Sequence, residues 1–264
     1  VSATFIIFLD SDDGFYDDYC EILYNVINSS DVDIVGCDRT SKLNDQLYIP
    51  NNIDSIDAST KTLDNDEKMF VEHTVWGNIY RTSFFEENNI KFLHILFEDV
   101  VFSVYCLLKT KKDVIYLPNY PGYIYLIENE KSVTHKVAIK TLNDFLTSMR
   151  LIYSLVKVNC SAETKINLLN KLMNMVFFII SKLDDKLEGI KILYAFENEL
   201  DFNLNQLSAP FNILNNFIMK RHFKIAVLFT KFMGALYNNK RIRNFLFVNY
   251  SGIKKLNDSK YLKD

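Results

Sequence analysis

The stretch FIIFLDSDD, residues 5–13, decides how the rest of the chain is interpreted. Its apolar part, Phe5–Leu9, is short and β-prone, which predicts a strand buried on both faces. Asp10, Asp12 and Asp13 follow it almost without interruption. Three carboxylates so close together repel one another unless a cation, a helix N-terminus or a ligand compensates their charge. The sequence therefore predicts a functional or capping role at the end of this strand.

The segments that follow indicate an α/β domain. Residues 15–28 carry apolar side chains at helical spacing, and residues 31–38 form a second short apolar run. Strand, helix and strand in this order are typical of an α/β unit with a parallel sheet. Residues 40–65 are polar and poorly periodic, which predicts a long loop or a small hairpin. Two aromatic strands are expected at 113–118 and 122–127.

The second half of the chain has a helical pattern. A helix is expected from Glu98 to about Lys109, and from about Val137 onward apolar residues recur at helical spacing. We therefore expect two domains, an α/β domain over residues 1–136 and an all-helical C-terminal domain over residues 137–264.

Composition and cysteine positions exclude several classes of protein. The cysteines lie far apart and form no CxxC pair, which indicates buried thiols in a reducing compartment and argues against a zinc site. No apolar run approaches the roughly 18 residues that cross a bilayer. The N-terminus also lacks the pattern of a signal peptide, so the expected location is the cytoplasm.

The charges are distributed unevenly along the chain. The first 100 residues hold 20 acidic and 6 basic side chains, whereas the remaining residues hold 13 acidic and 24 basic ones. Residues 217–245 mix aromatic and basic side chains, which fits either a peripheral helix on an anionic membrane surface or a helical domain with a solvated basic face. Nucleic acid is not an expected partner, because the chain is acidic overall and lacks a recognition motif.

Several kinds of site could begin with the acidic cluster. One carboxylate can cap the following helix, and Asp13, which closes the motif, is the residue expected to do so, but a cap does not need three carboxylates. A calcium loop is rejected, because Gly14 falls one position early and a strand stands where a helix is required. A phosphatase of the haloacid dehalogenase type would use Asp10 and Asp12, but it has Thr or Val where this chain has Gly14. The remaining interpretation is Mg²⁺ or Mn²⁺ holding a diphosphate, since such ions take only one or two protein carboxylates.

A second acidic pair, Glu98 and Asp99, starts the helix expected at 98–109. Carboxylates in a first helical turn compensate the helix dipole. A carboxylate fixed in that place can also act as a general base, and a sugar hydroxyl that attacks an activated carbon needs such a base.

These motifs occur together in a specific order: FLDSDD (8–13), VWGNIYRTSFFEENNIKF (75–92), FEDVVF (97–102), GYIYLI (122–127) and SVTH (132–135). In this order they resemble family 2 glycosyltransferases, of the bacterial and archaeal type that builds cell-surface polysaccharides. The resemblance covers roughly residues 5–135 and implies a GT-A fold. The expected fold class is therefore α/β, a partial GT-A sheet with helices, followed by an all-helical C-terminal region.

The resemblance also implies residues for the donor side of the site. Asp12 would hold Mg²⁺ or Mn²⁺ against the diphosphate of a UDP- or GDP-sugar, and Asp10 would lie beside it, near the ribose or the donor sugar. His135 would contact the metal or a phosphate. The metal would stabilise the negative charge that develops on the leaving nucleoside diphosphate.

On the acceptor side, the resemblance implies that Asp99, with Glu98 beside it, is the base. It would deprotonate a hydroxyl of a glycan or a lipid-linked acceptor, and the transfer of the hexosyl group would invert the anomeric carbon. Trp76 would line the acceptor side, or it would pack in the core as an ordinary aromatic residue. The enzyme would then act in the cytoplasm, free or peripheral on the inner face of the cell membrane.

Members of this family have further strands before the strand that carries the acidic motif, and these bind the nucleotide. The present sequence begins at Val1, just before that strand. We therefore expect an N-terminally truncated GT-A domain. The alternatives to an active transferase are a degenerate, non-catalytic transferase module that binds a partner or a membrane, and the Mg²⁺-dependent phosphatase described above.

Overall fold

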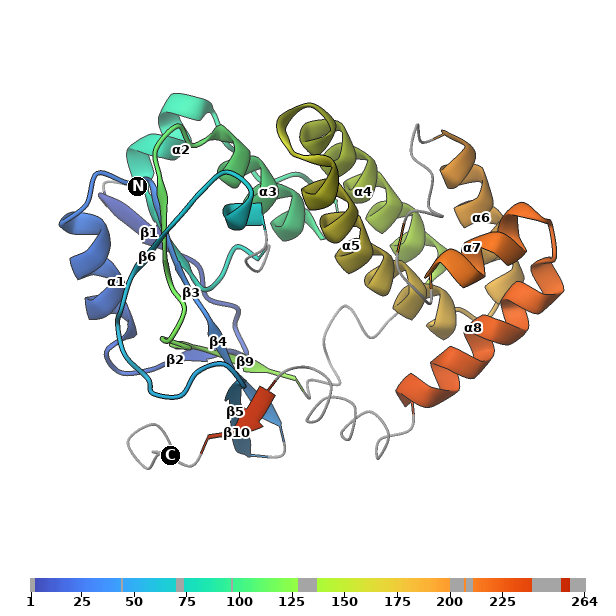
Figure 1. The fold of residues 1–264 in the computed structure, drawn as a ribbon, viewed down its shortest axis with the longest axis horizontal. Helices are drawn as coiled ribbons and strands as arrows, with labels where there is room; N and C mark the ends of the chain where they lie inside the picture. Colours follow the sequence, from blue (N-terminus) through green and yellow to red (C-terminus); the bar gives the residue numbers. More distant parts are fainter. Residues whose placement is uncertain are drawn as a thin grey trace. The chain divides into compact units, whose positions relative to one another are not determined.

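The computed structural model describes residues 3–43, 45–69, 74–95, 97–127, 137–199, 207, 211–238 and 253–256 (Figure 1). The chain divides into two compact units. The first unit consists of Val1–Phe92, Phe102–Lys131 and Phe245–Asp264, and the second consists of Leu93–Val101 and Ser132–Asn244. The expected domain boundary near residue 136 falls outside the described residues and stays a prediction.

Sheet A is a mixed sheet in the first unit. Its strand order is β1 (Phe5–Ile7), β7 (Asn78–Arg81), β3 (Ile34–Cys37), β8 (Val114–Leu117) and β6 (Lys61–Leu63). The β3 and β8 strands pair in parallel, and the other neighbours pair antiparallel. Because β7 lies between β1 and β3 and is antiparallel to both, β1 and β3 run in the same direction. The strand-helix-strand pattern thus predicted the direction of these strands correctly but not the strand that separates them.

The β1 strand lies at one end of sheet A, and the prediction that it is buried on both faces was wrong. All three of its residues are only partly buried, and Leu9, beyond its end, is 50% exposed. The Thr82 N–H donates to the Thr4 carbonyl (2.9 Å), so the backbone groups of Phe5 and Ile7 point away from β7. Within the described residues no strand pairs with that edge. An apolar sequence alone does not distinguish a central strand from a terminal one.

The α1 helix (Tyr19–Asn28) contacts β3 and β7 of sheet A. Tyr19, Leu23 and Ile27 are fully buried at i, i+4 and i+8, which is the stripe expected of an amphipathic helix. The helix begins four residues later than predicted, because Gly14 and Phe15 form β2 and pair with a distant strand instead.

Sheet B is the second sheet of the first unit. Its order is β10 (Ile253–Lys255), β5 (Gln46–Pro50), β4 (Arg39–Leu43), β9 (Tyr123–Leu126) and β2 (Gly14–Phe15). The segment expected to be a long loop or a small hairpin therefore contains the antiparallel pair β4 and β5. The β4 strand also pairs in parallel with β9, and β10 returns from the C-terminal part of the chain to pair with β5.

The other elements within the described residues are helical. They are η1 (Glu67–Met69), α2 (Thr82–Asn88), α3 (Glu98–Lys109), α4 (Ile139–Asn159), α5 (Ala162–Lys182), α6 (Lys186–Glu199), α7 (Phe211–Met219) and α8 (Phe223–Asn238). The long helices of the second unit bury apolar residues at helical spacing, as the sequence predicts. None of the helices in the described ranges is both long enough and apolar enough to cross a membrane.

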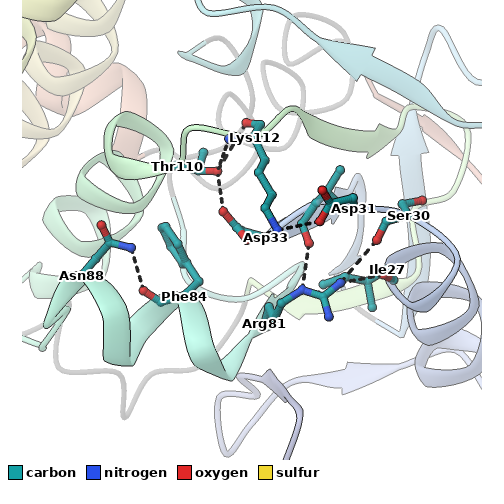
Figure 2. A network of polar contacts seen from close by, with 10 residues as sticks. Ile27, Ser30, Asp31, Asp33, Arg81, Phe84, Asn88, Thr110 and Lys112 are labelled. Atoms are coloured by element: carbon teal, nitrogen blue, oxygen red, sulfur yellow. Dashed lines mark hydrogen bonds and ion pairs between the residues drawn. The ribbon is translucent and has the colours of Figure 1, made fainter.

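Arg81 ties the end of β7 to the end of α1 (Figure 2). Its Nη2 donates to the carbonyl oxygens of Ile27 (3.1 Å) and Ser30 (3.3 Å), and its Nε donates to that of Val32 (3.2 Å). Because α1 ends at Asn28, the Arg81 guanidinium lies at the helix C-terminus, where the helix dipole favours a positive charge. One side chain thus holds the loop between α1 and β3 against sheet A.

Asp33, directly before β3, is part of the same network (Figure 2). Its carboxylate is buried, yet Oδ2 accepts a hydrogen bond from Thr110 (2.9 Å) and Oδ1 lies 3.6 Å from the Lys112 ammonium. The Asp33 carbonyl accepts from the Arg81 N–H (2.9 Å). A buried carboxylate is tolerated here because donors surround it.

Replacement of Arg81 by Lys should destabilise the protein. A single ammonium group cannot reproduce three hydrogen bonds made by a planar guanidinium, so we expect the free energy of unfolding in urea to fall by about 2 kcal/mol. Lys61→Ala is the matched control, because its exposed ion pair with Glu67 should contribute less than about 1 kcal/mol. Equal stability of Arg81→Lys and the unsubstituted protein would contradict the role of the guanidinium.

Candidate functional site

The acidic loop, residues 10–13, follows β1 in the first unit and is closed by a turn. The Asp13 N–H donates to the Asp10 carbonyl (3.1 Å). Asp10 and Asp12 are exposed, whereas Asp13 is partly buried. The loop therefore presents two carboxylates to solvent and directs the third inward.

Asp13 anchors the acidic loop to β9. One carboxylate oxygen accepts from the Tyr123 hydroxyl (2.7 Å) and the other accepts from the Leu126 N–H (2.8 Å). The Tyr123 oxygen in turn accepts from the Asp10 N–H (3.3 Å). The expectation that Asp13 caps the following helix was wrong, because β2 intervenes and Asp18 is the N-cap residue of α1.

The burial of this anchor changes the pKa of both partners. Burial raises the pKa of Asp13 above its ordinary value of 3.8, and the hydrogen bonds from Leu126 and Tyr123 oppose part of that rise. Burial also raises the pKa of Tyr123, and its hydrogen bond to Asp13 raises it further. The Tyr123 hydroxyl consequently keeps its proton at neutral pH and remains a donor to Asp13.

Tyr123 is part of an aromatic stack. The Trp76 ring lies nearly parallel to the rings of Tyr123 (4.6 Å between centroids) and Tyr125 (5.6 Å). The Arg39 guanidinium lies 5.0 Å from the Tyr125 centroid and 5.4 Å from the Trp76 centroid. Trp76 is only 7% exposed, so its position is that of a packing residue beneath the acidic loop. An acceptor contact by Trp76 stays a prediction.

Phe8 fixes the other end of the loop. Its ring packs against a cluster of aromatic side chains from β7, α2, α3 and the segment between the two helices, namely Tyr80, Phe85, Phe92 and Phe102. Phe92 and Phe102 are themselves stacked at 4.1 Å. The acidic loop thus leaves β1 from a well-packed base and ends at the Tyr123 anchor.

Glu98 and Asp99 lie in the first turn of α3, as predicted, and both are partly buried. They belong to the second unit, whereas Asp10, Asp12 and Trp76 belong to the first. Phe97, directly before the pair, has a φ of 64°, in the left-handed region that bulky side chains rarely adopt. Its ring packs edge-on against Phe145 at 4.8 Å, which holds the strained backbone in place.

The residues of the acidic loop are compatible with a metal ion that also binds phosphate. In the part of the chain that the structure describes, no group of three or more His, Cys, Asp and Glu side chains could hold a metal. Mg²⁺ on a diphosphate needs only one or two protein carboxylates, and the exposed oxygens of Asp10 and Asp12 fit that requirement. His135, the other predicted donor-side residue, lies outside the described residues.

A groove of the first unit lies away from the acidic loop. It has a volume of about 710 Å³, runs between β1 and α1 and is lined mainly by Phe5, Ile7, Cys20 and Tyr24. None of the carboxylates of the acidic loop lines it. The groove therefore belongs to the open edge of sheet A and not to the candidate metal site.

Sequence reasoning missed Tyr123, Arg39 and the anchoring role of Asp13. The alternation in YIYL, residues 123–126, places Tyr123 and Tyr125 on the same face of the strand, and this signal indicated an aromatic surface. It did not indicate that this surface lies beneath the acidic loop, because that depends on the pairing of β2, directly after the loop, with β9.

Comparison with known proteins supports the fold. No protein-family model matches the chain, and no curated protein matches it. Solved structures do match: S. aureus TarS 1–349 in complex with UDP-GlcNAc has a TM-score of 0.60 at 16% identity, over 86% of this chain and 66% of that one. The complex of the same protein with UDP has a TM-score of 0.60 over 86% and 65%.

The chain thus spans slightly less than two thirds of the length of these structures. Identity of 16% shows the fold alone. The fold is mixed α/β and resembles the GT-A glycosyltransferase fold.

Replacement of Asp13 by Asn should change how stability depends on pH. Folding raises the pKa of Asp13 above its value of 3.8 in the unfolded chain. The stability that this shift contributes to the folded protein is fully present below pH 3.8, and it is lost as the pH rises through the pKa of the folded state. Relative to the unsubstituted protein, Asp13→Asn should therefore gain stability as the pH is raised from about 4 to about 7. Urea unfolding at several pH values measures this difference, and a constant difference would refute the assignment. Asp17→Asn, an exposed neighbour, is the control.

Proposed function

We propose that the chain is a glycosyltransferase of the family 2 type that transfers a hexosyl group from a nucleotide-diphospho-sugar to an acceptor. The observation that carries this proposal is the acidic loop at the end of β1, in a fold that resembles GT-A. The likeness to TarS in complexes with UDP-GlcNAc and UDP supports a UDP-sugar as the donor.

The acidic loop is the proposed diphosphate site. Asp12, with Asp10 beside it, would hold Mg²⁺ or Mn²⁺, and the metal supplies Lewis-acid stabilisation of the leaving diphosphate. Asp13 keeps the loop in place through its hydrogen bonds with Tyr123 and Leu126. Ligand binding therefore does not have to bear the entropy cost of ordering Asp10 and Asp12. His135 is proposed as a further contact to the diphosphate.

Asp99 is the proposed general base, with Glu98 as its neighbour in the first turn of α3. It takes the proton of the acceptor hydroxyl while the hydroxyl oxygen forms a bond to the anomeric carbon. The bond from that carbon to the diphosphate oxygen breaks, and its electron pair leaves with the nucleoside diphosphate. Attack from the face opposite the leaving group inverts the anomeric carbon. The strained backbone at Phe97 supports a functional role for this turn.

The proposed acceptor is a glycan or a lipid-linked sugar, with Trp76 on the acceptor side. Such an acceptor is consistent with work at the cytoplasmic face of a cell membrane during the synthesis of a surface polysaccharide. Activated sugars that carry a nucleoside diphosphate fit the charge of the acidic loop only when a divalent cation accompanies them.

Titration calorimetry with UDP-GlcNAc tests the donor site. We expect binding in the presence of Mn²⁺ and at least about tenfold weaker binding after chelation, because Asp12 and Asp10 would hold a cation that compensates the charge of the diphosphate. Asp12→Ala should weaken binding to a similar extent, whereas Asp17→Ala, an exposed aspartate outside the loop, should not. Metal-independent binding, or normal binding by Asp12→Ala, would contradict the proposal. Hydrolysis of a simple phosphate ester that is lost in Asp10→Asn would favour the phosphatase instead.

Replacement of Asp99 by Asn tests the general base. Loss of a general base should lower the rate of transfer by about 10²- to 10⁴-fold, while the affinity for UDP-GlcNAc stays unchanged, because the base acts on the acceptor. Transfer to an acceptor glycan and calorimetric binding are measured on the same preparation. Asp113→Asn, an exposed carboxylate beyond the end of α3, is the matched control. Normal transfer by Asp99→Asn would exclude this role.

A further inference from the structure

The α7 and α8 helices form a tight hairpin in the second unit. Arg221, between them, adopts a left-handed backbone (φ 57°), and its N–H donates to the Ile218 carbonyl (2.8 Å). The His222 N–H donates to the Phe217 carbonyl (2.8 Å). These bonds satisfy the C-terminal end of α7 and allow α8 to begin at once. The direction of α8 is therefore set by hydrogen bonds and not by a long linker.

One face of α8 packs on neighbouring helices. Ala226 and Thr230 are fully buried. The Phe229 ring packs edge-on against Phe177 of α5 (6.1 Å) and Phe217 of α7 (6.3 Å). These contacts determine which side of α8 remains outside, so its exposed face is a fixed surface.

The exposed face of α8 carries a ridge of large apolar side chains. Ile225, Leu228 and Phe232 are 46%, 65% and 62% exposed. They stand at i, i+3 and i+7, so they form a single stripe along the helix. A continuous apolar stripe of this kind marks an interaction surface, whereas isolated exposed apolar residues do not. We call these three residues the α8 ridge.

The surroundings of the α8 ridge are basic. Lys224 and Lys231 are exposed on α8 beside the ridge, and in the described part of the chain neither makes an ion pair. The sequence contains no Asp or Glu between Asp201 and Asp258. The helix that carries the ridge therefore exposes apolar and cationic side chains, and it contains no acidic side chain.

We infer that the α8 ridge binds an anionic lipid surface. Leu228 and Phe232 enter the boundary between headgroups and acyl chains, while Lys224 and Lys231 lie at the level of the phosphates. Nucleic acid fits less well, because two of the three ridge residues are aliphatic and cannot stack on bases. The α8 ridge is a different surface from the acidic loop, and lipid binding by the ridge does not depend on whether the chain transfers sugar.

Vesicle flotation with the full chain tests this surface. Phosphatidylcholine vesicles that contain phosphatidylglycerol should bind the protein, and phosphatidylcholine vesicles alone should bind at least about tenfold less. The double variant Leu228→Gln, Phe232→Gln should lower binding to the anionic vesicles by at least about tenfold, because it removes the inserted apolar area. Lys224→Gln with Lys231→Gln should lower it by a similar factor and make the remainder insensitive to salt.

Matched controls distinguish binding through the α8 ridge from non-specific adsorption to vesicles and from misfolding of the variants. Val158→Gln replaces an apolar residue that is 84% exposed on α4, and Lys191→Gln removes an exposed charge on α6. Both should bind vesicles normally, and every variant should keep the circular dichroism of the unsubstituted protein. Equal binding to neutral and anionic vesicles, or normal binding by the ridge variant, would overturn the inference. Self-association that the ridge variant abolishes, without vesicle binding, would instead assign the surface to a second copy of the chain.

Discussion

The hydrogen bond from Tyr123 to Asp13 is the interaction on which the candidate site depends. It joins the loop after β1, in sheet A, to β9, in sheet B, across 110 positions of sequence. Two donors satisfy the Asp13 carboxylate, and the turn between Asp10 and Asp13 keeps the other side chains of the loop on the outside. The three carboxylates are thus not equivalent, since one is structural and two are accessible. That division answers the electrostatic problem posed by an acidic cluster at the end of an apolar strand.

Several elements could be predicted because their signals are local. The helix from Glu98 to Lys109 and the strands β8 and β9 lie where their apolar periodicity indicates, within a residue or two. The helices of the second unit follow from the same pattern. The Glu98–Asp99 pair lies in a first helical turn, as its position before an apolar run predicts.

The features that could not be predicted depend on distant partners. Phe15 fits the helical spacing of the residues that follow it, yet it pairs with β9 together with Gly14. The polar segment after residue 40 contains two strands because β9 and β10 lie on either side of them. Burial of β1 depends on its place in the strand order, and the partner of Asp13 depends on how the two sheets meet. None of these is a property of a short window of sequence.

The insertion of β7 between β1 and β3 has a consequence for the order in which the first unit folds. The β1 and β3 strands are separated by one helix along the chain, but neither can pair with the other, and both need β7, which is made about forty residues after β3. Non-local pairing of this kind is slow, because a long loop must close before the contacts that stabilise it exist. During synthesis, the pairing of β1 and β3 with β7 therefore cannot begin until residues 78–81 have been made. A chaperone that binds apolar segments can therefore act on this part of the chain before residue 81 leaves the ribosome.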